Sequence, residues 1–358
     1  DFMQRQLTQP TFTDAAVAEL GGTKTHAFLN QCQTLIPWNE LVAAITHLFP
    51  DQPKGGRPFE PAIVMIKCTM LAKWFNLSDP QLEEQLKDRI SFRQFVGLSF
   101  NDKTPDETTF VVFRKRLRES GSASILFDKV QSILTQRGVI VKEGSLIDAT
   151  IIEAPKGRRI KDETDALNNP ASDPASDPAL DTRHNTRDTR DPVATHTRKG
   201  GTCYFGYKAH IVTDVRGTIT NYVFDTASPH DSNHFDQLVG DETIAIYGDS
   251  AYRSQKREHE LKARGVKSMI CEKRVRGQKQ LTDAQRRHNA VCAKVRAKVE
   301  HAFAWMKRTG WRKVRYRGLR RNGLDFALMA VSYNLRHALH MLRQAKTFTS
   351  NIGPPASA

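Results

Sequence analysis

Cysteine is scarce in this chain, and the spacing of the cysteines argues against both a disulfide framework and a zinc-binding domain. The 358 residues include five cysteines, which are scattered and form no Cys-x-x-Cys pair and no cysteine–histidine spacing suited to zinc. Disulfide frameworks belong mainly to small secreted domains, whereas a chain of this length can bury a sizeable core without one. We therefore expect free thiols and a reducing compartment.

Long apolar runs are also missing. The most apolar stretch, residues 61–75, contains Lys67 and Lys73, and it is shorter than the roughly 20 residues that a membrane-spanning helix needs. The first residues lack the charged and then apolar layout of a signal peptide. These absences predict a cytoplasmic protein with no membrane segment.

Acidic residues are few relative to basic ones. The sequence has 54 Lys and Arg against 39 Asp and Glu, which gives a formal net charge of +15. The excess is concentrated, since residues 286–321 contain thirteen Lys and Arg and a single acid, Glu300. Such a cluster favours a polyanionic partner. A generally basic surface with no dedicated ligand is the alternative.

Residues 1–140 have the pattern of a mainly helical domain. The stretch 59–75 is apolar nearly all round, as expected of a central helix. Ser-Asp-Pro at 78–80 predicts a second helix start, and Thr-Pro-Asp-Glu at 104–107 has the form of a capping box before a third. Short helices of this kind suit a helix-turn-helix-like DNA-binding unit, and also a helical dimerisation module.

After Gly144 the pattern changes to one of strands. Residues 145–152 are apolar on both faces, which is typical of a central buried strand. A hairpin is expected next, followed by strands that alternate with helices, and together these predict an α/β domain with a mixed sheet over residues 141–345. The last long helix begins at the Thr-x-x-Gln box of 282–285. The expected strands cover residues 145–152, 203–214, 218–227, 242–247 and 266–271.

One segment stands apart by composition. Residues 161–191 repeat Ala-Ser-Asp-Pro twice and contain only two large apolar residues, Leu167 and Leu180. Such a stretch buries too little apolar surface to offset the entropy lost on ordering it. We expect a flexible insertion at about 161–195, between the first two strands, and a tail at 346–358.

An aspartate in the middle of the first strand is the first candidate catalytic residue. Asp148 lies within Leu-Ile-Asp-Ala-Thr-Ile, and this strand has no Lys or Arg to pair with it. A buried carboxylate is costly unless it is paired or binds a metal ion. Asp148 is therefore a candidate metal ligand. The alternative is an aspartate bonded to backbone at a strand end.

Two further acids complete the candidate set. Asp249 ends the fourth strand, and acids at the carboxyl ends of strands face the crevice where α/β domains bind ligands. Glu300 lies in the basic helix, on the same face as Arg296 and Lys307. The alternative for Glu300 is an ion pair with Arg296 on a solvated face. Three carboxylates would supply hard oxygen ligands, which suit Mg²⁺ or Mn²⁺ and not zinc.

Taken together, these stretches resemble the DDE transposases of bacterial insertion sequences, specifically the insertion-sequence-five group with its ribonuclease-H-like catalytic domain. The resemblance covers roughly residues 35–340. In the catalytic part it rests on Leu-Ile-Asp-Ala-Thr-Ile-Ile, Thr-Arg-Lys-Gly-Gly-x-x-Tyr-Phe-Gly-Tyr-Lys-Ala-His, Pro-His-Asp and Tyr-Gly-Asp-Ser-Ala-Tyr. The matching ranges are 146–152, 197–210, 229–231, 247–252, 295–307 and 314–318, with 56–61, 77–84 and 92–98 in the N-terminal part.

The family signature is Tyr, two residues, Arg, three residues, Glu, six residues, Lys. Arg296, Glu300 and Lys307 fit it, but the tyrosine position is Ala293. This departure leaves any tyrosine role open and does not touch the acids. The resemblance implies that Arg296 and Lys307 contact DNA at the transposon ends. Further DNA contacts are expected from Arg308, Arg312, Lys313, Arg315 and Arg317.

The resemblance also implies a mechanism. Asp148, Asp249 and Glu300 would hold two Mg²⁺ or Mn²⁺ ions, which clamp the attacking and leaving oxygens of an in-line displacement. The enzyme would cleave phosphodiesters at the element's end and join the freed 3′-hydroxyl to target DNA. Holding two ends implies a dimer or a larger assembly on DNA, associated with the nucleoid. A nuclease of the same fold that does not join, and a catalytically inactive DNA-binding derivative, are the alternatives.

Two accessory candidates remain. His230, next to Asp231, would assist near the site, or else stabilise its own turn. Trp305, with Trp311 after it, would stack on an unpaired base, or else pack in the interior.

Overall fold

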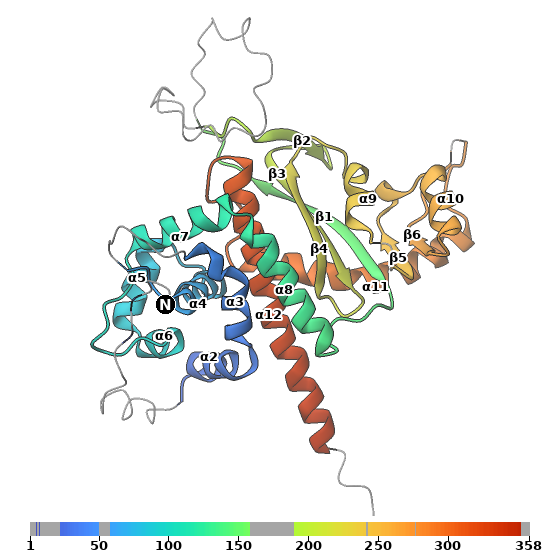
Figure 1. Cartoon of the computed structure of the whole chain (residues 1–358). Coiled ribbons are helices and arrows are strands. Elements are labelled where there is room, and N and C mark those ends of the chain that lie inside the picture. The colour runs from blue at the N-terminus through green and yellow to red at the C-terminus, as the bar shows by residue number, and fades with distance from the viewer. Residues whose placement is uncertain are drawn as a thin grey trace, which may run out of the picture. The chain divides into compact units, whose positions relative to one another are not determined.

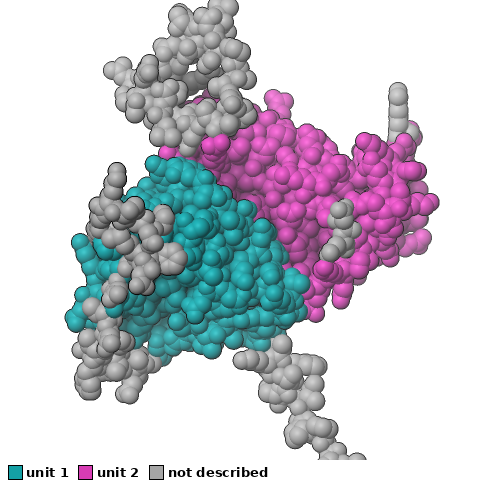
Figure 2. Space-filling view, in the orientation of Figure 1, with its two compact units in different colours: residues 1–139, 327–358 teal, residues 140–326 magenta. Residues whose placement is uncertain are grey.

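The computed structural model describes Arg5, Leu7 and residues 22–49, 58–157, 190–240, 243–275 and 277–351, with backbone alone for 345–351. The chain forms two compact units, drawn in Figure 1 and coloured separately in Figure 2. The first unit comprises residues 1–139 and 327–358, and the second comprises residues 140–326. The sequence placed the end of the catalytic domain at 345, whereas helix α12 (Leu319–Asn351) belongs to the first unit from residue 327 onward. The tail expected from 346 therefore begins inside α12, and residues 352–358 lie outside the described part.

The first unit is built of helices, as the sequence predicts. At its centre α4 is buried nearly all round, and this includes Lys67. The Lys67 amine donates to Gln33 Oε1 at 2.8 Å and lies 5.5 Å and 5.4 Å from the ring centres of Trp38 and Phe95. Burial lowers the pKa of Lys67 to about 8. The α-helices described within residues 1–139 are α2 (Lys24–Leu35), α3 (Trp38–Ile45), α4 (Ala62–Trp74), α5 (Asp79–Asp88), α6 (Ile90–Val96), α7 (Glu107–Glu119) and α8 (Ser122–Gln136).

Two helix starts in this unit test the capping expectations. Helix α5 begins after Ser78, whose backbone N–H donates to Gln81 at 2.9 Å in a capping box. The box expected at 104–107 is wrong, because α7 begins two residues after Pro105 with Asp106 as its N-cap. The Asp106 carboxylate accepts from the Thr109 amide at 2.7 Å. An aspartate accepts this bond as well as a threonine does, and it lies nearer the first helical turn.

The second unit contains the predicted mixed sheet. Its strand order is β2-β3-β1-β5-β6, and β4 pairs with β3 outside this path. Strand β3 pairs antiparallel with β1, β2 and β4, whereas β5 pairs parallel with β1 and β6. Strand β2 was not expected, since its residues lay at the edge of the predicted insertion. The strands are β1 (Ser145–Glu153), β2 (Thr195–Lys199), β3 (Thr202–Asp214), β4 (Ile219–Thr226), β5 (Ala245–Gly248) and β6 (Lys267–Ile270).

Helices pack on both faces of the sheet. On one face Ile147 and Val212 belong to a buried cluster with Phe235 and Tyr252. Successive side chains of a strand point to opposite faces, so Asp148 faces away from this cluster. Helix α11 packs against β1 and β5 (Figure 1). The helical elements of this unit are η3 (Asp231–His234), α9 (Phe235–Leu238), η4 (Ser250–Tyr252), α10 (Gln255–Ala263) and α11 (Asp283–Arg308).

The predicted insertion falls mostly on residues 158–189, which lie outside the described part. Its C-terminal end, by contrast, belongs to the packed unit. The buried Asp191 carboxylate accepts from the Tyr207 hydroxyl at 2.7 Å and from the Gly318 amide at 3.1 Å. Strand β2 follows from Thr195, so the flexible insertion expected up to about 195 includes neither Asp191 nor Thr195.

Gly206 is required where β3 closes on the end of β1. A Cβ at this position would lie 2.1 Å from the carbonyl oxygen of Ile152 and 2.8 Å from the backbone nitrogen of Ala154. Gly206→Ala should therefore lower the free energy of unfolding by about 1–3 kcal/mol, as overpacking does. Gly240 is the matched control, because a Cβ there meets nothing within 4 Å. Urea unfolding should show Gly240→Ala within about 0.5 kcal/mol of wild type, and equal losses in the two variants would contradict this account.

Candidate active site

Asp148 is a largely buried carboxylate on the central strand β1. Its side chain is 22% exposed, and its Oδ1 accepts from the Ala149 amide at 2.9 Å. Burial raises the pKa of Asp148, and the charge of Asp249 adds to this rise, whereas the Ala149 amide, Arg296 and Lys199 oppose it. The strand itself offers no cation, so every opposing charge comes from another element.

Asp249 is brought beside Asp148 by the parallel pairing of β1 and β5. Leu146 pairs with Tyr247, and this register continued by two residues aligns Asp148 with Asp249. Asp249 is the N-cap of η4, and its Oδ1 accepts from the Ser250 hydroxyl at 3.1 Å. The two aspartates predicted as site residues therefore meet at the carboxyl end of β5.

A glycine allows this close approach of the two strands. At Gly248 a Cβ would lie 3.0 Å from Ile147 Cγ2. A larger residue before Asp249 would therefore push against the strand that carries Asp148.

Arg296 of α11 lies against the two aspartates. Its Nη2 is 3.8 Å from Asp148 Oδ1, and its Nη1 is 3.9 Å from Cys271 Sγ. Burial opposes the charge of Arg296, but Asp148 and Asp249 outweigh it and raise its pKa. The side chain is 16% exposed. The ion pair expected as the alternative, Arg296 with Glu300, is not formed between these described residues, because the guanidinium turns to Asp148.

Glu300 lies one turn after Arg296 on α11, and its side chain is exposed. Within the described ranges, no three acidic, histidine or cysteine side chains lie close enough to hold a metal ion. The structure thus brings Asp148 and Asp249 together and does not gather Glu300 with them. The two aspartates fit a hard divalent cation by their donor chemistry, since they are adjacent carboxylates of which one is desolvated. The third oxygen donor would have to come from a rearranged Glu300 or another ligand.

Lys307, two turns further along α11, also lies near Asp148. Burial lowers the pKa of Lys307, and the charges of Lys199 and Arg312 lower it further, whereas Asp148 acts in the opposite direction. Lys199 is a charged neighbour of Asp148 and Lys307 that the sequence did not single out. In the sequence Lys199 is marked only by its position before two glycines, in a stretch for which no chemical role was predicted.

The basic segment after α11 runs beside the end of β1. Glu153 donates its N–H to the Arg312 carbonyl at 3.3 Å, and Val314 donates its N–H to the Glu153 carbonyl at 2.9 Å. This bridge holds the segment at the strand that carries Asp148. The predicted DNA-contacting side chains are exposed at Arg308, Arg312, Lys313, Arg315 and Arg317.

The two accessory candidates, Trp305 and His230, make contacts that stabilise the fold. Trp305 is 8% exposed and Trp311 is 2% exposed, so neither presents a free ring to a base, which favours the alternative of packing in the interior. Trp311 packs on Phe326 with ring centres 4.8 Å apart. The ring Nδ1 of His230 lies 2.8 Å from the Ser232 hydroxyl at the start of η3, which fits the turn-stabilising alternative.

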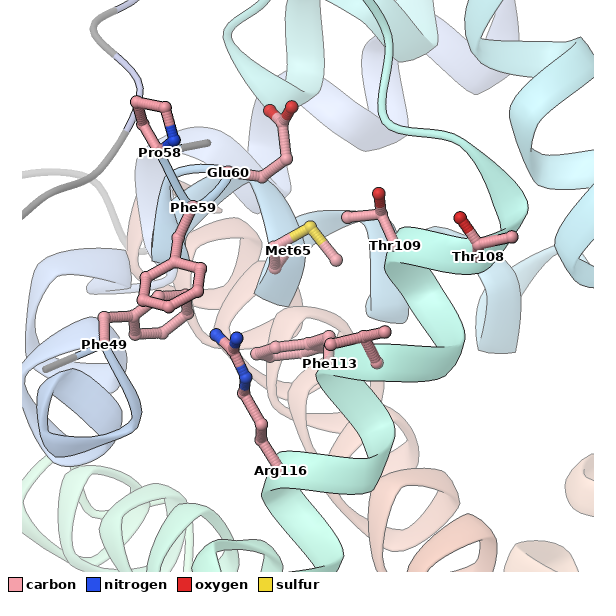
Figure 3. A pocket seen from close by; sticks show the side chains of 10 residues that line it. Phe49, Pro58, Phe59, Glu60, Met65, Thr108, Thr109, Phe113 and Arg116 are labelled. Carbon is pink, nitrogen blue, oxygen red and sulfur yellow. The ribbon is translucent and has the colours of Figure 1, made fainter. Parts of the chain in front are cut away.

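A cavity in the first unit has a different chemistry (Figure 3). Its volume is about 180 Å³. The Arg116 guanidinium lies 3.9 Å from the ring centre of Phe59, and Glu60 is paired with Arg5 at 2.9 Å. Without adjacent carboxylates, this cavity is not a candidate for phosphodiester chemistry. Its other lining residues are Phe49, Pro58, Met65, Thr108, Thr109, Val112 and Phe113.

The raised pKa of Asp148 has a consequence for stability. The folded state favours the protonated carboxyl, so stability is lost as pH rises through the raised pKa. Asp148→Asn should therefore raise the melting temperature at pH 7, and the gain should shrink toward about pH 4, near the ordinary aspartate pKa. Asp283, exposed in the first turn of α11, is the control. Asp283→Asn should give no gain, and a destabilised Asp148→Asn at pH 7 would refute the burial argument.

No helix in the described ranges is long and apolar enough to cross a membrane.

Comparison with known protein families agrees with this geometry. Residues 141–335, more than half of the chain, match the family model described as Transposase DDE domain. Residues 20–116 match a second model, Transposase domain (DUF772). No solved structure matches the chain significantly. The sheet and the paired aspartates lie within the first match, and most of the helical unit's described helices lie within the second. The chain therefore belongs to the DDE transposase family of DNA-cutting enzymes.

Proposed function

We propose that this transposase belongs to the insertion-sequence-five group, and that it cleaves DNA at its element's ends and joins the freed 3′-hydroxyl to target DNA. The observation that carries the proposal is the pairing of Asp148 with Asp249 across two neighbouring strands, with Arg296 against them. Adjacent acids at the carboxyl end of a strand, beside basic groups, suit a reaction at a phosphodiester.

A divalent cation, Mg²⁺ or Mn²⁺, fits this donor set. Asp148 and Asp249 would hold it, and Glu300 would complete the ligands after moving from its exposed position. When bound, such ions stabilise the charge on the attacking and leaving oxygens of an in-line displacement.

The chain's own residues prepare the site for this chemistry. Arg296 balances the two aspartates before DNA arrives, so that the carboxylates stay close despite their mutual repulsion. Lys307 lies near Asp148 without an ion pair among the described residues, and it would hold the phosphate in register. A displacement of about 1 Å in such a group can cost on the order of a hundredfold in rate.

The exposed basic segment would extend this contact along the DNA. This segment begins at Arg308, the last residue of α11, and continues through Arg312, Lys313, Arg315 and Arg317. The bridge to Glu153 fixes part of it beside β1. The helical unit would bind transposon ends or mediate assembly, because two ends must be held at once. We place the enzyme in the cytoplasm with the nucleoid, as a dimer or a larger assembly on DNA.

The three acids provide the first test of this function. Asp148→Asn, Asp249→Asn and Glu300→Gln should each lower Mg²⁺-dependent nicking of duplex DNA carrying the element's terminal repeat by at least about a hundredfold. Binding of the same duplex should stay within roughly threefold of wild type, because the acids make no phosphate contact. Glu260→Gln, exposed on α10, is the control. Near wild-type nicking by any of the three variants would show that its acid is not a metal ligand.

The salt dependence of binding tests the basic segment. Each phosphate neutralised by a cation contributes about 0.9 to the slope of log affinity against log salt. The double variant Arg312→Gln and Lys313→Gln should therefore flatten this slope by up to about 1.8. Lys256→Gln with Lys262→Gln on α10 removes the same charge elsewhere. Equal slopes for the two double variants, by fluorescence anisotropy, would place the DNA surface outside this segment.

A further inference from the structure

The tip of the β2–β3 hairpin presents a lysine at a fixed place. Lys199 is the last residue of β2 and pairs with Thr202 of β3. Gly200 and Gly201 connect them with φ angles of 57° and 80°. Two consecutive left-handed residues make the tight turn whose twist matches that of the flanking strands, and glycine adopts this conformation without strain. The turn therefore sets where the Lys199 side chain begins.

Three cations from separate parts of the chain lie within electrostatic reach of one another, since Lys199 and Arg312 both act on Lys307. Lys199 comes from β2, Lys307 from α11 and Arg312 from the segment bridged to the end of β1. The charges of Lys199 and Arg312 act on Lys307, and Lys199 also acts on Asp148. The side chains of Lys199 and Arg312 are exposed, and Lys307 is partly buried.

These cations have little to compensate them within the described residues. None of the three forms an ion pair there, whereas some other cations of the same unit do, such as Arg253 with Glu272 at 3.0 Å and Lys208 with Asp231 at 2.9 Å. The one acid that acts favourably on Lys307 is Asp148, which also has Arg296 beside it. Like charges held together without counter-charges are unfavourable, and a bound anion removes the penalty.

We propose that Lys199, Lys307 and Arg312 form one binding site for a single phosphodiester group next to Asp148, and that Lys199 is a positioning residue for the reaction. The identity of the anion as the reacting phosphodiester of DNA rests on the proposed function, whereas the anion site itself does not. Three donors from separate elements fix the phosphate in more than one direction, and Lys199 approaches it from the hairpin tip.

Neighbouring residues supply the controls. Arg198 precedes Lys199 on the same strand, so its side chain points to the opposite face, and it is exposed. Arg198→Gln removes the same charge from the same hairpin without touching the cluster. Lys199→Arg keeps the charge, and it should restore what Lys199→Gln loses.

Binding of a short DNA duplex of arbitrary sequence to the full chain tests the anion site. At about 0.1 M salt the loss of one phosphate contact weakens binding on the order of tenfold, since the slope is about 0.9. Lys199→Gln and Lys307→Gln should each show this loss. Because they share one phosphate, the double variant should lose clearly less than the product of the two. Equal losses for Lys199→Gln and Arg198→Gln, or full additivity of the pair, would overturn the proposal.

A second readout separates this site from folding and from catalysis. An amine-reactive reagent followed by mass spectrometry should show Lys199 and Lys307 protected together by the duplex, while Lys262 on α10 stays reactive. This protection should persist in Asp148→Asn. If protection is seen but no variant or condition gives Mg²⁺-dependent nicking, the proposed function fails and the anion site stands. Unprotected Lys199 in a protein that binds and nicks DNA would overturn the anion site alone.

Discussion

Asp148 sets the constraint on which the rest of the site depends. A carboxylate on a central strand is removed from most of its water, and burial raises its pKa. The parallel pairing of β1 with β5 then brings Asp249 beside it and makes the charge still less favourable. Arg296, itself largely buried, is the counter-charge that lets both acids remain there. A fold selected only for stability would place an apolar side chain at this position.

The cations around Asp148 and Asp249 differ in how far their side chains are buried. Arg296 lies 3.8 Å from Asp148, Lys307 is partly buried, and Lys199 and Arg312 are exposed. Exposed cations beside a partly buried pair of acids suit an anionic polymer that binds from solvent and places one of its groups at the aspartates. Acids of the chain compensate the charge of Arg296. Lys199, Lys307 and Arg312 have no ion-pair partner among the described residues. DNA would therefore complete the charge balance that folding leaves open.

The sequence predicted the strands and the two aspartates because their signals are local. An apolar run interrupted by Asp148 shows both the central strand and the cost of its carboxylate, and Tyr-Gly-Asp marks a strand end. Contacts between distant elements were not visible in the same way. Whether Arg296 pairs with Asp148 or with Glu300 depends on how α11 packs on the sheet. The burial of Trp305 depends on the same packing. Lys199 was missed because its role depends on a strand, β2, that only pairing with β3 reveals.

The central claim is that Asp148 and Asp249, which the fold brings together, bind a divalent metal ion. Its most direct measurement is Mn²⁺ binding to the full chain without DNA, followed by electron paramagnetic resonance. Wild type should bind Mn²⁺, Asp148→Asn and Asp249→Asn should each lose this binding, and Lys199→Gln should retain it. Equal Mn²⁺ binding by wild type and Asp148→Asn would contradict the account.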